Sequence, residues 1–252
     1  MHCESDGSLL LGAGPGSPVV AAMQDGKAHE TTAFLLHREG HRLLVQLQAR
    51  PIHHANGVIA GALELFEEVS APMRSRAREL EDFGCSDIST RAANRKFGEM
   101  MVQQALEALN AFEIPFGWLR IGLDGAENLH HGYGQGMVDG AVKMIAATLD
   151  RSLGPLDVLT RWDGAEFRVE VSRCSRSELA AAAERLRLLV RASTLEWWGD
   201  RLSVTISIGG ATAEPGDSIE TLEQRVSEVY DGCHAAGGDR AAIAHVSRTR
   251  VD

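Results

Sequence analysis

The chain has 252 residues, 44% of them hydrophobic and 24% charged, which is typical of a soluble globular protein with a sizeable core. Its formal net charge of −10 disfavours nonspecific binding to nucleic acids and to anionic membranes, so we expect neither as a partner. The 4 cysteines are scattered singly, and the sequence shows neither a membrane-spanning apolar run nor a signal-peptide pattern, so we expect a cytoplasmic protein without a disulfide framework.

Residues 1–68 show the pattern of a short helix followed by an antiparallel meander. Glycines and prolines make residues 7–18 rich in turns, and a short helix is expected at residues 19–23. Strand-like runs follow at residues 31–37, 41–49 and 58–66. They are separated by Glu39-Gly40 and by Asn56-Gly57, and the Asn-Gly pair is a typical hairpin turn.

The stretch HREGHRLLVQLQARPIHHANGVIAGALELFEEVS, residues 37–70, resembles the C-terminal half of a PAS sensory domain. Such a domain usually needs about 100 residues. The resemblance therefore implies that its first strands and most of its helices precede Met1. A sheet severed in this way has an unpaired edge, which either a partner chain or the Gly- and Pro-rich start of this chain would cover.

Histidines are frequent in this segment. We interpret them as solvated strand ends, with metal binding as the less favoured alternative, because their spacing matches no familiar ligand set. His37 and His41 can face each other across a turn. The histidines concerned are His29, His37, His41, His53 and His54.

Residues 69–86 are predicted to form a linker helix. Ser70 and Pro72 suit a helix start, and Met73, Ala77 and Leu80 lie along one side. Similarity to PAS-linked proteins implies that this helix pairs with its twin in a homodimer. A solvated spacer explains the pattern equally well.

Residues 87–246 alternate between helix and strand patterns. Helices are expected at 94–112, 136–153, 177–190 and 219–235, and strands at 117–123, 203–209 and 241–246. Between them a hairpin is expected around Asp163-Gly164, because both residue types tolerate positive φ. This order predicts an α/β sandwich with antiparallel pairing, compatible with a ferredoxin-like arrangement with additions.

The hairpin tip, DGAEF at residues 163–167, stands where the GGDEF family carries Gly-Gly-Asp/Glu-Glu-Phe. Residues 87–95, 123–135, 207–211 and 229–240 also resemble that family in order and spacing. The family includes diguanylate cyclases, which join two GTP molecules into cyclic di-GMP. The resemblance implies an α+β chain: a partial PAS-like sheet at 1–68, a linker helix at 69–86, and a nucleotide cyclase-like GGDEF domain at 87–252.

The resemblance also implies where metal ligands should stand. Joining two nucleoside triphosphates needs a divalent cation such as Mg²⁺, which prefers carboxylate oxygens. The two acidic positions of the family are Gly122 and Ala165 here, and neither has a side-chain oxygen. The backbone carbonyl of Leu123 would be a third ligand. We therefore expect no metal ligand, no cofactor and no catalytic residue among the motif positions Asp163, Gly164, Ala165, Glu166 and Phe167.

The nucleotide contacts implied by the family are also altered. Positions where lysines would meet phosphates are Glu127 and either Cys233 or His234. A weak nucleotide site would consist of His130, Asp139, Asp124 and Glu166.

Two further positions bear on activity. The product-inhibition motif Arg-x-x-Asp is Gly154 to Asp157, so Arg151 would have to replace the arginine. A displaced carboxylate cluster of Asp124, Asp163 and Glu166 is the arrangement that could still hold Mg²⁺.

The leading hypothesis is a catalytically inactive GGDEF domain that serves as a regulatory or interaction module in cyclic di-GMP signalling. We expect a homodimer formed through the PAS-like segment and the linker, with a protein partner that the sequence does not identify. Two alternatives stay open. One is a diguanylate cyclase with unusual Mg²⁺ ligands, and the other is a regulator that binds GTP or cyclic di-GMP without turnover.

Overall fold

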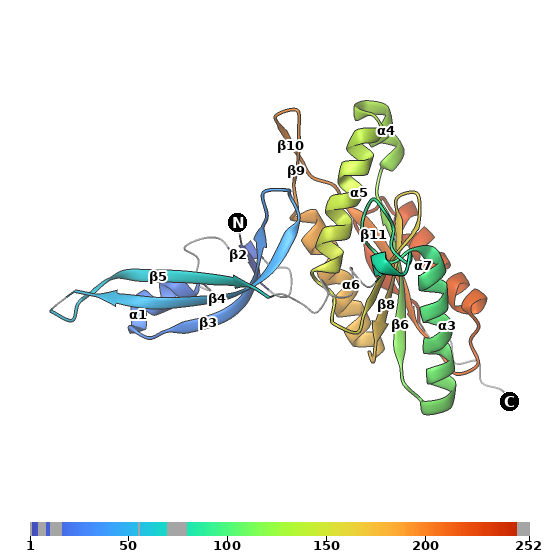
Figure 1. Ribbon diagram of the computed structural model, residues 1–252, viewed down its shortest axis with the longest axis horizontal. Coiled ribbons are helices and arrows are strands. Elements are labelled where there is room, and N and C mark those ends of the chain that lie inside the picture. The colour runs from blue at the N-terminus through green and yellow to red at the C-terminus, as the bar shows by residue number, and fades with distance from the viewer. Residues whose placement is uncertain (1, 5–8, 11–16, 55, 70–79, 246–252) are drawn as a thin grey trace.

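The computed structural model describes residues 2–4, 9–10, 17–54, 56–69 and 80–245, which form two sheets with their helices (Figure 1). Within those ranges, no helix combines the length and apolar character that a membrane span requires. Most of the predicted linker helix, residues 70–79, lies outside the described residues, and Leu80 to Asp82 are helical.

The N-terminal sheet is an antiparallel meander with one helix packed on it. Its strand order is β2-β1-β3-β4-β5. The elements are β1 (His2–Glu4), β2 (Leu9–Leu10), α1 (Pro18–Asp25), β3 (His29–Leu36), β4 (Arg42–His53) and β5 (Ile59–Glu68). The predicted helix and three strands are confirmed, and each strand is longer than expected at one end. Figure 1 shows β4 and β5 extending away from the C-terminal sandwich.

The edge of β3 is paired by the start of the chain itself. His2 to Glu4 of β1 lie antiparallel to Ala33 to Leu35 of β3. The residues that pair with β3 precede the Gly- and Pro-rich stretch that the sequence predicted would cover this edge. The relation of this sheet to PAS domains stays a prediction.

The C-terminal sheet has the order β12-β11-β6-β8-β7, and its helices lie on both faces. Its elements are α3 (Arg95–Phe112), β6 (Phe116–Leu123), α4 (Ala126–Tyr133), α5 (Gln135–Asp150), β7 (Val158–Asp163), β8 (Glu166–Ser172), α6 (Arg176–Arg191), β9 (Leu195–Trp197), β10 (Asp200–Leu202), β11 (Ile206–Thr212), α7 (Ile219–Ala235) and β12 (Ala241–Ile243). The order β11-β6-β8-β7 is the antiparallel order of a ferredoxin-like fold, which confirms the predicted sandwich, and β12 adds a parallel strand at one edge.

Some elements and boundaries differ from those predicted from the sequence. The α4 helix and the small β9–β10 hairpin were not predicted. The α6 helix begins at Arg176, one residue earlier than expected. The reason is that Ser175, and not Ser177, is the N-cap residue and forms the capping box with Glu178. At the motif hairpin Asp163 pairs with Glu166, so the two turn residues are Gly164 and Ala165, and Gly164 has the positive φ of 41°.

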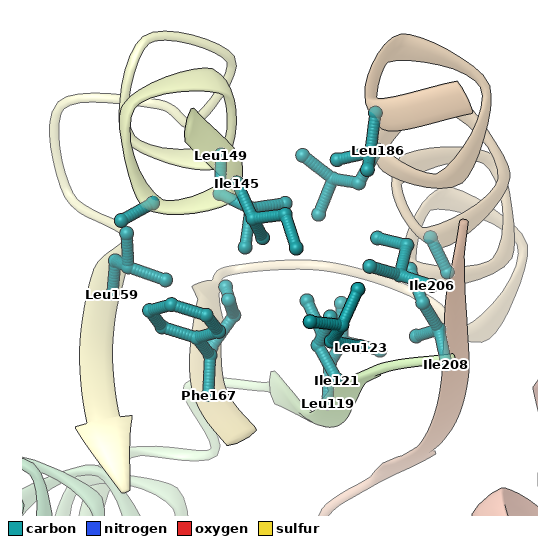
Figure 2. Packing of buried hydrophobic residues seen from close by; sticks show 14 of the residues in the cluster. Leu119, Ile121, Leu123, Ile145, Leu149, Leu159, Phe167, Leu186, Ile206 and Ile208 are labelled. Carbon is teal, nitrogen blue, oxygen red and sulfur yellow. The ribbon is translucent and has the colours of Figure 1, made fainter. Parts of the chain in front are cut away.

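One face of the C-terminal sheet carries the main hydrophobic core. Alternate residues of β6 and β8 point to this face, where α5 and α6 cover them (Figure 2). The side chains of Leu119, Ile121, Phe167 and Val169 are fully buried there. The intervening residues of the same strands point to the opposite face, which carries the candidate site.

Candidate functional site

Gly122, at the end of β6, is the first position where the family would place a metal-binding acid. An ideal Cβ added to Gly122 would lie 2.0 Å from the Oη atom of Tyr230 on α7. The Tyr230 side chain is 7% exposed, and burial followed by the negative charge of Glu166 raises its pKa to about 12. A neutral tyrosine therefore occupies the space that a carboxylate side chain would need.

Arg120, two residues before Gly122, holds both this tyrosine and the motif glutamate. Its guanidinium lies 4.3 Å from the centre of the Tyr230 ring, a cation–π contact. It also donates two hydrogen bonds to Glu166, from Nε to Oε2 at 3.2 Å and from Nη2 to Oε1 at 2.8 Å. The cross-strand register explains this meeting, because Gly122 of β6 lies opposite Glu166 of β8.

Glu166 is fully engaged by cations. Arg168 adds a third hydrogen bond at 3.2 Å to the same carboxylate. Burial of the carboxyl raises its pKa, but the hydrogen bond and charge of Arg120 and the charge of Arg168 lower the pKa more, so it lies below its ordinary value. Guanidinium groups thus take three of the roughly four acceptor positions of this carboxylate.

Arg168 extends the network across the sheet. Its side chain is 3% exposed, and its Nε donates to Glu223 of α7 at 2.9 Å. The indole nitrogen of Trp118 donates to the other oxygen of Glu223 at 2.8 Å, and the Trp162 ring packs on the Arg168 guanidinium at 5.0 Å. This face of the sheet is thus closed by ion pairs and aromatic rings.

Asp124 joins separate segments just after β6. It accepts hydrogen bonds from Oγ1 of Thr205 at 2.8 Å and from Oγ of Ser207 at 2.6 Å. It also accepts from the backbone N–H of Asp239 at 2.8 Å, and a Cβ on Gly238 would collide with its carboxyl. These partners give Asp124 a structural role where three segments of the domain converge.

The structure does not bring the acidic motif residues together. In the part of the chain that it describes, one group of three metal-ligating side chains has ligand atoms within 4.8 Å of one another, and it is His37, Glu39 and His41. Asp124, Asp163 and Glu166 form no such group. Asp163 is exposed at the end of β7, and Ala165 packs at the edge of the main core.

Most of the positions implied for nucleotide contacts are exposed on α4 and α5, and one is buried. His130 and Asp139 are both exposed, on α4 and α5, and Asp139 accepts a hydrogen bond from Gln135 at 2.8 Å. Glu127 is exposed on α4, whereas Cys233 is buried and its thiol points to the carbonyl of Ile208.

The other implied phosphate-binding position and the product-inhibition positions contact neighbouring residues of the protein. His234 is 57% exposed at its side chain and lies 3.7 Å from Asp124. Asp157 accepts hydrogen bonds from the backbone N–H groups of Gly154 and Ser172, at 2.8 and 3.0 Å. Arg151 lies 4.0 Å from Glu68 of the N-terminal sheet.

Sequence reasoning missed the residues that close this face. Arg120 and Arg168 stand at alternate positions among apolar residues of β6 and β8, which is the pattern of a strand with one polar face. That alternation was the available signal. The partner residues Glu223 and Tyr230 come from a distant helix, and their contacts leave no local sequence pattern.

Comparison with known proteins agrees with this fold. Residues 85–239 match the family model described as diguanylate cyclase, GGDEF domain. The match spans well over half of the chain, so the protein belongs to the GGDEF domain family.

Relatives and solved structures extend the comparison. The chain is 23% identical to the diguanylate cyclase DosC of Escherichia coli K12 over 220 residues, which are 87% of this chain and 46% of that protein. It is 26% identical over 170 residues to diguanylate cyclase A of Treponema denticola, covering 66% of this chain and 46% of that protein. The chain therefore spans about half the length of these curated relatives.

The fold is similar to the coiled coil and GGDEF domain of DgcB from Caulobacter crescentus in complex with c-di-GMP. The TM-score is 0.62 at 20% identity, with 68% of this chain and 92% of that chain covered. It is also similar to the diguanylate cyclase SiaD of Pseudomonas aeruginosa in complex with its activator SiaC. There the TM-score is 0.64 at 21% identity, with coverage of 68% and 66%.

Proposed function

We propose that this GGDEF domain makes no cyclic di-GMP and serves as a regulatory or interaction module in cyclic di-GMP signalling. The observation that carries the proposal is the Tyr230 side chain in the space beside Gly122. The retained core and the altered polar face together support a domain kept for its shape and surface rather than for turnover.

The residues present do not fit the Mg²⁺ that cyclase chemistry would need. Gly122 and Ala165 have no side-chain oxygen, and Glu166 is bound to Arg120 and Arg168. A divalent cation would have to compete with the two guanidinium groups for the carboxylate oxygens of Glu166. Cyclase activity with unusual ligands is therefore the weaker alternative.

A nucleotide-binding regulator is the second candidate, and one observation favours it. His130 and Asp139 are exposed on neighbouring helices, so both can reach a ligand. An imidazole and a carboxylate can hydrogen-bond a guanine edge without any metal. GTP or cyclic di-GMP would then bind weakly, because the phosphate-facing positions include Glu127 and the buried Cys233.

We further propose a homodimer formed through the N-terminal sheet and the linker. Edge strand β5 exposes Leu63 at 49%, Leu65 at 47% and Phe66 at 62%. An edge strand with exposed apolar side chains tends to pair with another chain. Light scattering at several concentrations tests this proposal, and a monomer at every concentration contradicts it.

The central experiment incubates the purified chain with GTP and Mg²⁺ or Mn²⁺ and separates the products by chromatography. We expect no cyclic di-GMP above a control preparation of an unrelated protein from the same host. Product above that control that is lost in Glu166→Gln or Asp163→Asn would overturn the proposal. GTP affinity measured in parallel, with wild type compared with Asp139→Asn, distinguishes the nucleotide-binding regulator from a module that binds no nucleotide.

A further inference from the structure

The tip of the β3–β4 hairpin gathers three side chains of the kinds that bind transition metals. His37, Glu39 and His41 each offer one ligand atom, and these atoms all lie within 4.8 Å of one another. The Nδ1 atom of His37 is 3.8 Å from Oε2 of Glu39. The group lies at the β3–β4 connection and contains no residue of the GGDEF motif.

The backbone of the turn explains why these side chains converge. The Gly40 N–H donates to the His37 carbonyl at 2.9 Å, and the His37 N–H donates to the His41 carbonyl at 2.9 Å. Gly40 has a φ of +89°, the left-handed conformation that closes a three-residue hairpin loop. The loop places the rings of His37 and His41 in a stack with 4.4 Å between centroids.

His41 is buried, and one of its ring nitrogens has no hydrogen-bond partner among the described residues. The residue is 4% exposed, and its Nε2 atom is buried with no hydrogen-bond partner among the described residues. A buried polar atom without a partner is uncommon and costly in a native protein. The expectation that these histidines are solvated strand ends is therefore wrong for His41.

We propose that His37, Glu39 and His41 bind one divalent transition metal ion, with Zn²⁺ as the expected ion. Two imidazoles and one carboxylate are a donor set that Zn²⁺ takes at about 2.0 to 2.2 Å, whereas Mg²⁺ and Ca²⁺ prefer oxygen ligands alone. Tetrahedral coordination needs the ligand atoms closer together than they are. The Glu39 side chain is 66% exposed, so its inward rotation would displace water and not packed side chains. The fourth position is left for water.

The proposed ion would lie next to a contact between the β3–β4 hairpin and the C-terminal domain. The hairpin tip is docked on the C-terminal domain: the Thr194 N–H donates to the Gly40 carbonyl at 3.2 Å, and a Cβ on Gly40 would collide with the Thr194 carbonyl. The buried Arg42 side chain bonds the carbonyl of Ala192 at the end of α6. Metal binding would therefore stiffen the tip at the contact between the two sheets.

Calorimetric titration of the full metal-free chain with Zn²⁺ tests the proposal. His37→Gln and Glu39→Gln are the informative variants, because both positions are more accessible than His41 and are expected to fold. His54→Gln, an exposed histidine at the other hairpin, is the matched control. Circular dichroism of each variant checks that its fold is unchanged.

We expect His37→Gln to weaken Zn²⁺ binding by about tenfold or more, Glu39→Gln to weaken it in the same direction, and His54→Gln to leave it unchanged. The wild type loaded with Co²⁺ should show the visible absorption of tetrahedral coordination, and His37→Gln should lose it. Absence of Zn²⁺ binding in the wild type would overturn the proposal. Equal affinities for wild type, His37→Gln and Glu39→Gln would overturn it as well.

Discussion

The two faces of the C-terminal sheet differ sharply although they share the same strands. The face under α5 and α6 is built from buried aliphatic and aromatic side chains (Figure 2). The face under α3 and α7 combines an apolar cluster near Trp118 with the buried charge of Arg168 and the partly buried charges of Arg120 and Glu223. One face is held by dispersion and the hydrophobic effect, and the other depends on paired charges.

This difference separates what keeps the fold from what enables family chemistry. From the GGDEF motif, the apolar face uses the buried ring of Phe167 and, at its edge, the side chain of Ala165. The motif glutamate, Glu166, lies on the polar face. There it is hydrogen-bonded by the guanidinium group of Arg120, which also packs on the Tyr230 ring. The proposed loss of turnover would therefore leave the core of the fold intact, because a fold and the site on one of its faces can vary separately. Substitutions on each face test this separation.

The largest expected effect is on the apolar face. Phe167→Ala removes a fully buried ring and should lower the free energy of unfolding by about 3–5 kcal/mol. Urea denaturation measures the loss. Phe112→Ala is the control, because Phe112 is 75% exposed and its truncation should change stability little. Equal effects of the two variants would contradict the placement of the core.

On the polar face, Arg168→Ala should lower the free energy of unfolding by about 2–3 kcal/mol. The substitution leaves the Glu223 carboxylate without the guanidinium group of Arg168. The free-energy cost is smaller than for a fully buried ion pair, because the Glu223 side chain is 25% exposed. The double variant Arg168→Met, Glu223→Gln removes both charges, keeps an acceptor for the buried Trp118 indole N–H, and should recover part of the stability. If the double variant were less stable than Arg168→Ala, the face would not be organised around this ion pair.

A smaller effect is expected beside Tyr230. Gly122→Ala should destabilise the domain by about 1–2 kcal/mol, because its Cβ must displace the end of a buried ring. Gly132→Ala is the control, since a Cβ at that exposed helical glycine meets nothing within 4 Å. Thermal unfolding of the two variants measures the contrast, and a neutral Gly122→Ala would show that the space is open.

The smallest effect is in the pH dependence. The pKa of Glu166 is below its ordinary value of 4.5, so its ion pairs contribute stability that is fully present above pH 4.5 and is lost as the pH falls through the folded-state pKa. Wild type should therefore exceed Glu166→Gln in unfolding free energy at pH 7 and converge with it in acid. Urea denaturation across this range checks the prediction, and a constant difference down to pH 3 would contradict it.

Much of the fold and part of the site follow from the sequence alone. Strand alternation and hairpin turns predict the meander and the motif hairpin, because these depend on neighbouring residues and on side-chain direction along one strand. That Gly122 and Ala165 have no side-chain oxygen is likewise a matter of residue identity. What such reasoning misplaced, such as the one-residue shift of the turn to Gly164-Ala165, was set by the pairing of Asp163 with Glu166.

The tertiary structure decided which side chain fills the space beside Gly122. Tyr230 reaches Gly122 from a helix more than 100 residues away, and Arg120 meets Glu166 only because two strands pair in a particular register. The same holds at the other end of the chain, where burial of His41 comes from docking against the C-terminal domain. Local sequence patterns determine which helices and strands form. Contacts between elements that are distant in the sequence determine which buried polar atoms have a hydrogen-bond partner within the protein and which have none.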